Sequence, residues 1–355
     1  MSEEHVLSRR SWMGGVAAAL GYVGIRPGNL WAQVRGAAPA AAGAARPRMT
    51  PEEYDGFAKL ANNENPYGPP DSVMKAMTQA FKYANRYGYP DGDIVQEIAK
   101  HHGVKPENVL LGAGSGEILR VVGTTFLQGG KKVLGVEPSY GSVYQHAAGI
   151  KADAIKLPLR ADYRQDIPAM IKTTRKNYRD IGFVYLCNPN NPTGVIVTSQ
   201  EVKQLLDGIP EDMPVLIDEA YHHFVDDPSY ATSVPYVVEG RPVIIARTFS
   251  KIVGLAGMRL GYGIAPKPLI DAMRPHGIGS INAIVKWGGV AGLKDTATQE
   301  HVKRTTLELR KKKVAVGRPF PPMLEHLRVS VGTAEEMSRF MVAFKEIFAT
   351  KQQAS

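Results

Sequence analysis

The sequence predicts an α/β protein in which helices cover a mainly parallel β-sheet. From Thr50 onward, segments with helical periodicity alternate with short apolar runs, and Gly or Pro bounds most of these runs. The composition agrees with this class, because 355 residues with 44% hydrophobic and 22% charged side chains are enough for a large core. We therefore expect one large domain and a smaller one.

The first 47 residues have the composition of an export signal followed by a linker. Arg9 and Arg10 precede a mildly apolar run from Gly14 to Val23, and an Ala/Gly/Pro-rich stretch continues to Pro47. A secretory leader has the same order, with charged residues first, then a short apolar core and then small residues. The arginine pair resembles the twin-arginine signal. We expect export to the periplasm, and a cytoplasmic protein with a basic tail is the alternative.

Five short apolar runs are the candidate strands. Their length and continuous apolarity favour strands that are buried on both faces, although buried helix segments have the same pattern. None approaches the roughly 18 apolar residues of a membrane-spanning helix. The runs are Val109–Leu111, Lys132–Val136, Phe183–Leu186, Val215–Ile217 and Val243–Ala246.

The charge and the metal-binding residue types exclude several classes of function. The net charge is +9, but no basic run is interleaved with aromatic residues, so we expect affinity for small anions and no nucleic-acid partner. The single Cys187 excludes an internal disulfide and a thiolate metal cluster. His222 and His223 are adjacent, and neighbours on a strand point to opposite faces, so we expect no metal site there.

Three of the candidate strands are followed by polar residues of different chemistry. Asn188–Gly194, Asp218–Tyr221 and the pair Ser250-Lys251 each come after one of them. Taken singly, these segments are typical of a turn, a helix cap and a solvated lysine. Ligands bind beyond the carboxyl ends of parallel strands, so an amide, a carboxylate and an amine at one edge predict a cofactor site.

Six stretches carry a resemblance to a known family, from about residue 60 to 335. They are Asn63–Pro69, Gly112–Glu117, Asn188–Gly194, Asp218–Tyr221, Ser250–Tyr262 and Leu327–Thr333. In this order they resemble the fold-type I pyridoxal-phosphate aminotransferases, and most of all the histidinol-phosphate aminotransferase family. The resemblance implies a seven-stranded, mainly parallel sheet, a pyridoxal 5'-phosphate cofactor, and a homodimer with active sites at its interface.

The same resemblance implies the roles of the residues around the cofactor ring. Lys251 holds the cofactor through a Schiff base and later moves a proton as a free amine. Asp218 keeps the pyridine nitrogen protonated, which lets the ring take up electrons. Asn191 and Tyr221 bind the phenolic oxygen, and Tyr140 stacks on the ring.

The cofactor phosphate is expected at the start of a helix, where backbone N–H groups meet an anion. A hydroxyl and a guanidinium add charge-assisted hydrogen bonds. Tyr89, or Tyr87 in its place, is expected to reach the phosphate of the partner subunit. The residues of the phosphate site are Ala113, Gly114, Ser115, Ser250 and Arg259.

Four residues are expected to bind the substrate. By resemblance, Arg328 binds the amino acid carboxylate, for which its fork of donors is suited. Arg318 corresponds to a second arginine, which binds the distal phosphate of histidinol phosphate. Tyr67 and Asn191 line the pocket.

The resemblance breaks in the C-terminal part. Only Lys311–Lys313 stands where family members carry a turn, a strand and parts of two helices, a gap of about one supersecondary unit. We expect a large cofactor domain over residues 48–270, with a substrate segment at 60–70. A small domain over residues 271–355 lacks this helix-strand-helix unit, which leaves the placement of both arginines open.

The expected activity is transfer of an amino group. The donor is histidinol phosphate or an aromatic amino acid, and the acceptor is a 2-oxo acid such as 2-oxoglutarate. A decarboxylase or a carbon-sulfur lyase is an alternative, because the same cofactor bond serves these reactions. A catalytically impaired protein on this fold is the other alternative.

Overall fold

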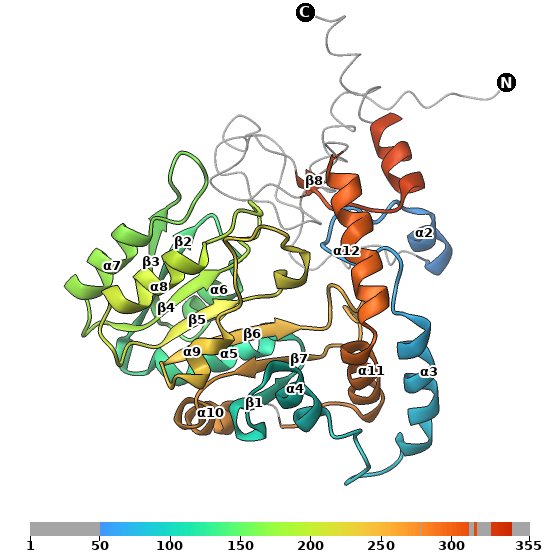
Figure 1. The fold of residues 1–355 in the computed structure, drawn as a ribbon, viewed down its shortest axis with the longest axis horizontal. Coiled ribbons are helices and arrows are strands. Elements are labelled where there is room, and N and C mark those ends of the chain that lie inside the picture. The colour runs from blue at the N-terminus through green and yellow to red at the C-terminus, as the bar shows by residue number, and fades with distance from the viewer. Residues whose placement is uncertain (1–49, 278, 312–315, 318–327, 343–355) are drawn as a thin grey trace, which may run out of the picture. The chain divides into compact units, whose positions relative to one another are not determined.

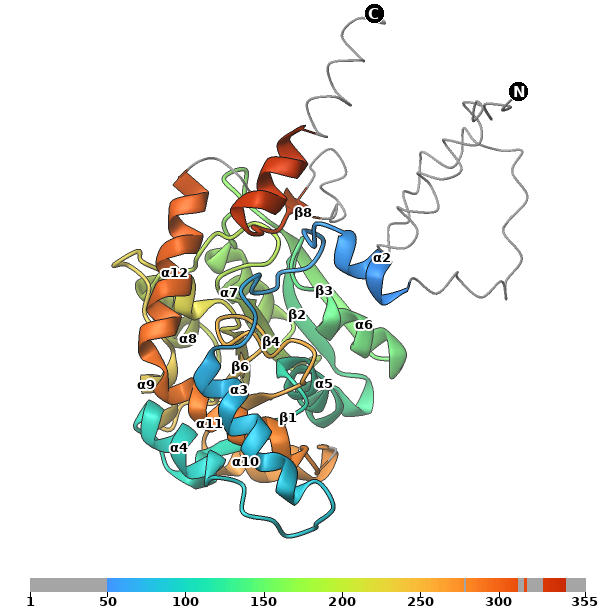
Figure 2. The same ribbon diagram turned by 90° about the vertical axis from the view of Figure 1, so that its right-hand side faces the viewer.

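The computed structural model describes residues 50–277, 279–311, 316–317 and 328–342. The chain divides into two compact units, residues 64–313 and residues 1–63 with 314–355. The larger unit continues past residue 270, where the sequence placed the end of the large domain. It does so because α11 (Ala283–Lys294) packs against α3 (Asp71–Ala80) and α4 (Ile94–His102), and Figure 2 shows α3 running beside α11.

A seven-stranded sheet forms the centre of the larger unit (Figure 1). The strand order is β1-β7-β6-β5-β4-β2-β3, and every neighbouring pair is parallel except those of β7, which runs antiparallel to β1 and β6. The mainly parallel seven-stranded sheet is therefore confirmed. The strands are β1 Val109–Gly112, β2 Lys132–Glu137, β3 Asp153–Pro158, β4 Ile181–Cys187, β5 Val215–Asp218, β6 Val243–Thr248 and β7 Gly261–Ile264.

Two strands were not among the predicted runs. β3 lies at the edge of the sheet, none of its residues is buried, and they do not form a continuous apolar run. β7 contains Gly261 and Gly263, which weaken a strand pattern. At Gly261 a glycine is required, because a Cβ would lie 2.4 Å from the backbone nitrogen of Ser115.

Helices cover both faces of the sheet, as the alternation of apolar runs and helical segments predicts. Side chains of α5, α6 and α10 pack on one face, and those of α4, α7, α8, α9 and α11 pack on the other. The remaining helices of this unit are α5 Ser115–Phe126, α6 Ser142–Gly149, α7 Ile167–Lys176, α8 Ser199–Gly208, α9 Val234–Val238, α10 Lys267–Met273 and α12 Thr296–Lys311.

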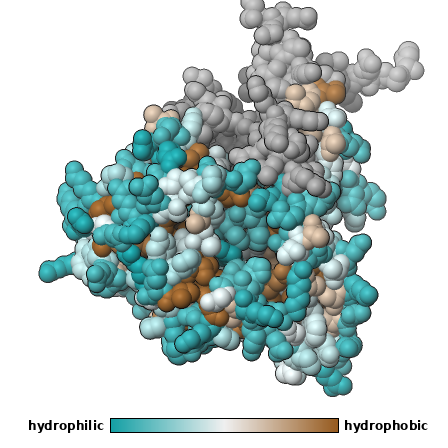
Figure 3. All heavy atoms as spheres, viewed as in Figure 1, coloured by the Kyte–Doolittle hydropathy of each residue, from teal (hydrophilic) through white to brown (hydrophobic). Residues whose placement is uncertain are grey.

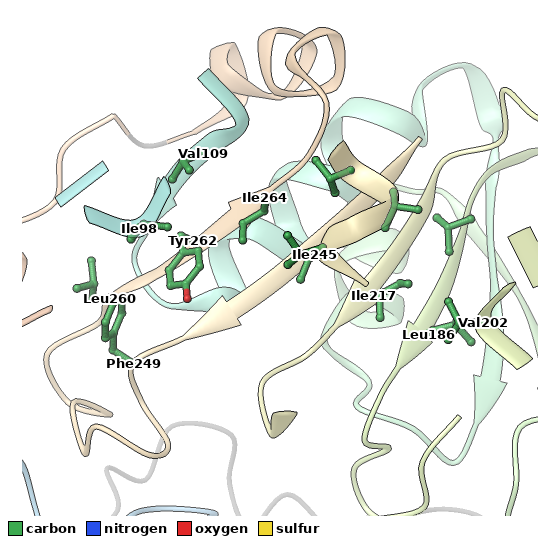
Figure 4. Close-up of a cluster of buried hydrophobic side chains, with 14 of the residues drawn as sticks. Ile98, Val109, Leu186, Val202, Ile217, Ile245, Phe249, Leu260, Tyr262 and Ile264 are labelled. Carbon is green, nitrogen blue, oxygen red and sulfur yellow. The ribbon is translucent and has the colours of Figure 1, made fainter. Parts of the chain in front are cut away.

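The core on the second face runs across the sheet (Figure 4). Figure 4 labels side chains of this core from α4, α8 and the strands β1, β7, β6, β5 and β4, and along the strands they alternate with the side chains of the other face. Burial of each large apolar side chain contributes about 1.5–3 kcal/mol. This packing makes the sheet a rigid support for the loops at its edges.

The smaller unit contains α2 (Pro51–Gly56) and a two-stranded antiparallel sheet of β8 (Val316–Gly317) and β9 (Arg328–Val329). Residues 334–342 are helical. Hydrogen bonds join its early and late segments, since the Lys59 backbone N–H donates to the Glu336 carboxylate at 3.0 Å and the Ser330 N–H donates to the Leu60 carbonyl at 2.8 Å.

The face drawn in Figure 3 is mostly hydrophilic, and its hydrophobic residues form small separate patches. Within the described part of the chain, none of the helices combines the length and the apolarity that crossing a bilayer requires.

Candidate functional site

Six neighbouring strands bring the predicted residues to one edge of the sheet. β1, β2, β4, β5 and β6 end there, and β7 begins there because it runs in the opposite direction. The register shows the alignment directly, because Gly261 lies opposite both Gly112 and Thr248, and Asp218 lies opposite Cys187. Lys251 follows the end of β6, and Arg259 stands two residues before the start of β7. Because β6 and β7 run in opposite directions, both residues lie at the same edge of the sheet.

Asp218 is the last residue of β5 and is only 2% exposed. The backbone N–H of Ala220 donates to its Oδ1 at 3.2 Å. Burial raises the pKa of the Asp218 carboxyl to about 7, against the effects of the Ala220 N–H and of the positive charge of Lys251, which lower it. A buried carboxyl in this state is stabilised in its charged form by a cationic partner.

Three polar side chains from neighbouring strands meet beside Asp218. Asn191 Nδ2 donates to the Tyr221 hydroxyl at 3.4 Å. Lys251 Nζ lies 5.5 Å from the centroid of the Tyr221 ring. An amide, a phenol and an amine from the loops after β4, β5 and β6 are thus brought together.

The other asparagines of the loop after β4 have structural roles. The Asn188 side chain donates to the Val197 carbonyl and accepts from the Val197 N–H, both at 2.9 Å. Asn190 accepts from the Ser139 hydroxyl at 2.9 Å and donates to the Pro138 carbonyl at 3.2 Å. This last pair of bonds joins the loop of Asn191 to the loop of Tyr140, a half-buried residue that follows Ser139.

The expected phosphate site lies at the start of α5, but Ala113 differs from its expected role. Its N–H donates to the Glu117 carboxylate, so this donor is already used. Its carbonyl accepts from Arg259 Nη2 at 3.2 Å, so Ala113 holds the arginine in place. Ser115 and Gly116 occupy the first turn of α5, where backbone N–H groups have no intrahelical partner.

Ser250 and Arg259 form a pair next to this helix start. The Ser250 hydroxyl oxygen accepts from Thr248 Oγ1 at 2.8 Å and from Arg259 Nη1 at 3.3 Å. A hydroxyl has one proton to donate, and two donors at its oxygen leave that proton for a bound anion. The site therefore offers a hydroxyl, a guanidinium and helix N–H groups, which is the donor set that a phosphate requires.

Gly114 makes the close approach of Arg259 possible. Its φ is +79°, and a Cβ at this position would lie 2.2 Å from Arg259 Nη2. Any side chain would occupy the space in which the guanidinium lies beside α5.

A buried ion pair that sequence reasoning missed lies next to this edge. Arg247 Nη2 and Glu219 Oε2 are 2.6 Å apart, and their side chains are 4% and 1% exposed. The second Glu219 oxygen accepts from the Ser233 N–H at 2.7 Å, and Arg247 Nη2 also donates to Thr232 Oγ1 at 2.7 Å. The signal was present, because Arg247 directly follows the apolar run Val243–Ala246, and Glu219 follows Asp218 just after the run Val215–Ile217.

The sequence argument about His222 and His223 is wrong in its geometry. Both residues lie in the 3-10 turn η4 (His222–Phe224), and their ring centroids are 3.7 Å apart. Burial and the charge of Arg247 lower the pKa of His222 well below its usual value, and its ring nitrogens contact Arg247 Nη1 and the Glu219 carbonyl, each at 2.8 Å. In the described ranges, no three His, Cys, Asp or Glu residues are grouped to hold a metal ion.

The residues expected on the substrate side have different outcomes. Tyr67 is 47% exposed, and its ring meets His301 edge-on with centroids 6.3 Å apart. The Tyr89 hydroxyl donates to the Ile281 carbonyl at 2.7 Å in its own chain, whereas Tyr87 is fully exposed.

The two expected substrate arginines belong to the smaller unit. Arg318 lies outside the described residues. Arg328 begins β9 opposite Gly317. The residues at the expected gap, 312–315, also lie outside the described ranges.

Comparisons with known proteins agree with this geometry. Histidinol-phosphate aminotransferases of Moorella thermoacetica and Caldicellulosiruptor saccharolyticus are 39% and 34% identical over 67% and 72% of this chain. These matches span 62% and 69% of the length of those proteins.

Solved structures have the same fold. A putative histidinol-phosphate aminotransferase from Erwinia carotovora atroseptica superposes with a TM-score of 0.75 at 26% identity, covering 82% of this chain and 96% of the other. The Sinorhizobium meliloti histidinol-phosphate aminotransferase in complex with pyridoxal-5'-phosphate has a TM-score of 0.76 at 22% identity, covering 88% and 99%. Residues 56–279 match the family Aminotransferase class I and II, and because this match covers more than half of the sequence, the chain belongs to that family.

Proposed function

We propose that this protein is a pyridoxal-phosphate-dependent aminotransferase. Its donor is histidinol phosphate or an aromatic amino acid, and its acceptor is a 2-oxo acid such as 2-oxoglutarate. The observation that carries the proposal is the meeting of buried Asp218, Lys251 and the Asn191-Tyr221 pair at the sheet edge that also holds the anion site. Family membership and the names of the similar proteins support it.

The residues present fit the cofactor. Pyridoxal phosphate supplies an aldehyde that condenses with amines and a ring that takes up electrons from the substrate carbon. A protonated ring nitrogen would stabilise the buried Asp218 in its charged form, and the carboxylate would in turn keep that nitrogen protonated. Asn191 and Tyr221, which are joined by the 3.4 Å hydrogen bond from Asn191 Nδ2 to the Tyr221 hydroxyl, would bind the ring oxygen.

Lys251 would hold the cofactor through its aldehyde, and its free amine would serve as the base. Its amine lies over the Tyr221 ring at the edge where the substrate carbon is expected, so it is placed to carry a proton to and from that carbon. Ser250, Arg259 and the first turn of α5 would hold the phosphate. Tyr140 would stack on the ring and limit its tilt.

The experiment uses the native, freshly purified protein. We expect absorbance from a covalently bound cofactor, and borohydride should fix the cofactor mass on the tryptic peptide containing Lys251. A donor panel with 2-oxoglutarate should then yield glutamate. Release of carbon dioxide or a thiol would instead indicate one of the other pyridoxal-phosphate reactions. A protein that stays colourless after addition of the vitamer would refute the proposal.

Gly114→Ala should weaken binding of pyridoxal phosphate about 10- to 150-fold, which corresponds to loss of one charge-assisted hydrogen bond of about 1.5–3 kcal/mol. The added methyl group would displace Arg259, whose Nη2 lies 2.2 Å from the Cβ position. The affinity is measured by equilibrium dialysis of the cofactor-free protein.

Gly130→Ala is the matched control for this change. Gly130 has the same φ of +79°, but a Cβ there would have no neighbour within 4 Å. Gly130→Ala therefore introduces the strain of a positive φ without a steric clash. Equal loss of affinity in both variants would show that strain, and not the arginine, is responsible.

We also propose export through the twin-arginine pathway and assembly as a homodimer. Arg9 and Arg10 before the mild apolar run support export. Replacing both by lysine should keep the protein in the cytoplasmic fraction after osmotic shock, whereas the unchanged protein should appear in the periplasmic fraction.

The homodimer is tested separately by sedimentation of the purified protein. Sedimentation as a monomer would contradict the dimer.

A further inference from the structure

We propose that Asn65 is a positioning residue that fixes the turn carrying Lys251 and ties it to Tyr67. The inference deepens the proposed function, on which it rests for the role of Lys251. It concerns contacts within the larger unit, between a segment near the start of that unit and the turn after β6.

The side-chain amide of Asn65 makes hydrogen bonds through both its nitrogen and its oxygen. Its Nδ2 donates to the Ile252 carbonyl at 3.2 Å and to the Gly68 carbonyl at 3.3 Å. Its Oδ1 accepts from the Tyr67 N–H at 3.1 Å. An asparagine amide has two N–H donors, so these two carbonyls use both. One half-buried side chain thus connects the residue next to Lys251 with the residue expected at the substrate.

The two backbone segments are also in close contact. The turn after β6 closes with a hydrogen bond from the Gly254 N–H to the Lys251 carbonyl at 3.1 Å. Gly254 has a φ of +75°, and a Cβ there would lie 2.5 Å from the Gly68 carbonyl oxygen. The side chain of Asn65 therefore adds hydrogen bonds between two segments, residues 65–68 and the turn after β6, whose backbones are already in contact.

This arrangement links the positions of Tyr67 and Lys251. The Tyr67 ring is half-exposed and meets His301 of α12 edge-on, so a ligand can contact it. A displacement of Tyr67 alters the hydrogen bond at Oδ1, and rotation of the amide then alters the bond to Ile252. Asn65 acts through these neighbours and is not itself a catalytic residue.

The test is Asn65→Asp. Aspartate has the same shape and keeps the acceptor for Tyr67, but it loses both donated bonds and places a charge against two carbonyls. In cofactor-free protein we expect the backbone amides of residues 251–255 to exchange with deuterium about 10-fold faster, the factor that corresponds to loss of a hydrogen bond of about 1.4 kcal/mol. In the loaded enzyme we expect kcat to fall more than KM rises, and the pH midpoint of the cofactor absorbance to shift.

Asn108→Asp is the matched control. Asn108 also accepts one backbone N–H, from Lys105 at 3.1 Å, and donates to one distant carbonyl, that of Ala265 at 3.0 Å. It precedes β1, at the opposite end of the sheet. We expect this variant to lower the melting temperature without changing exchange at residues 251–255 or the pH midpoint.

The outcomes separate the inference from the proposed function. If both variants change only the melting temperature, Asn65 has a merely structural role and the inference is overturned. If the unchanged protein binds no pyridoxal phosphate, the proposed function fails, while exchange in the cofactor-free protein still decides whether Asn65 holds the turn.

Discussion

Asp218→Asn is expected to abolish most of the activity and, at the same time, to stabilise the cofactor-free protein above pH 7. The activity should fall by about 10²–10⁴-fold, the range for a group that holds or transfers a proton in the reaction. The amide has the same shape as the carboxyl but cannot carry the negative charge that keeps a ring nitrogen protonated. The rate is measured as glutamate formation with saturating cofactor.

The stabilisation follows from the raised pKa of Asp218. Its pKa is about 7 in the folded protein and 3.8 for the unperturbed group, so the folded state binds this proton more tightly than the unfolded state. The contribution to stability is fully present below pH 3.8 and is lost as the pH rises to about 7. A difference of about 3 units is at most about 4 kcal/mol.

Urea unfolding of the cofactor-free protein at pH 5 and pH 8 checks this expectation. The difference in unfolding free energy between Asp218→Asn and the unchanged protein should grow with pH, because the variant does not lose this contribution. The control is Asp153→Asn, an exposed carboxylate whose pKa is lowered by the Ala154 N–H and by Lys132. A constant difference between Asp218→Asn and the unchanged protein would contradict the expectation.

The sequence predicted those parts of the fold and site that depend on residues close together in the chain. The runs Val215–Ile217 and Val243–Ala246 have to be buried on both faces, and polar residues within a few positions after such a run lie near the sheet edge. For this reason Asp218 and Lys251 could be placed at one edge before the structure was known. Their order along the edge depends on strand order, which the apolar pattern does not contain.

Features that depend on register or on a distant partner could not be predicted in this way. The hydrogen bond from Arg259 to the Ala113 carbonyl joins residues far apart in the chain and follows from how β7 passes the start of α5. β7 itself was missed because its glycines are selected by that close approach and not by strand propensity. His222 was assigned to a strand because periodicity does not distinguish a strand end from a 3-10 turn.

The buried pair Glu219-Arg247 is the second place where a large effect is expected. Glu219→Gln and Arg247→Met should each lower the unfolding free energy by about 3–5 kcal/mol, because each leaves one buried charge without its partner. Water cannot compensate, since the side chains are 1% and 4% exposed. The loss should appear as an earlier urea midpoint with an unchanged slope.

The surface pair Arg241-Asp207 provides the control for burial. Its N–O distance is also 2.6 Å, but its side chains are 26% and 44% exposed. Asp207→Asn and Arg241→Met should therefore cost about 0–1 kcal/mol each. Equal losses for the two pairs would contradict the assignment of the effect to burial.

The double variant Glu219→Gln with Arg247→Met separates charge from shape. With the guanidinium removed, the buried amide at 219 has no unpaired charge beside it and still offers an oxygen to the Ser233 N–H, which in the native protein donates to Glu219 at 2.7 Å. The double variant should therefore lose less stability than the sum of the two single changes, by about 0.5–3 kcal/mol.

The same double variant also tests whether the ion pair affects the cofactor site. Glu219 follows Asp218 directly, and its N–H donates to the Ala246 carbonyl at 3.0 Å. A double variant that recovers stability but binds the cofactor weakly would thus show that the ion pair sets the spacing of the β5 and β6 ends that carry Asp218 and Lys251.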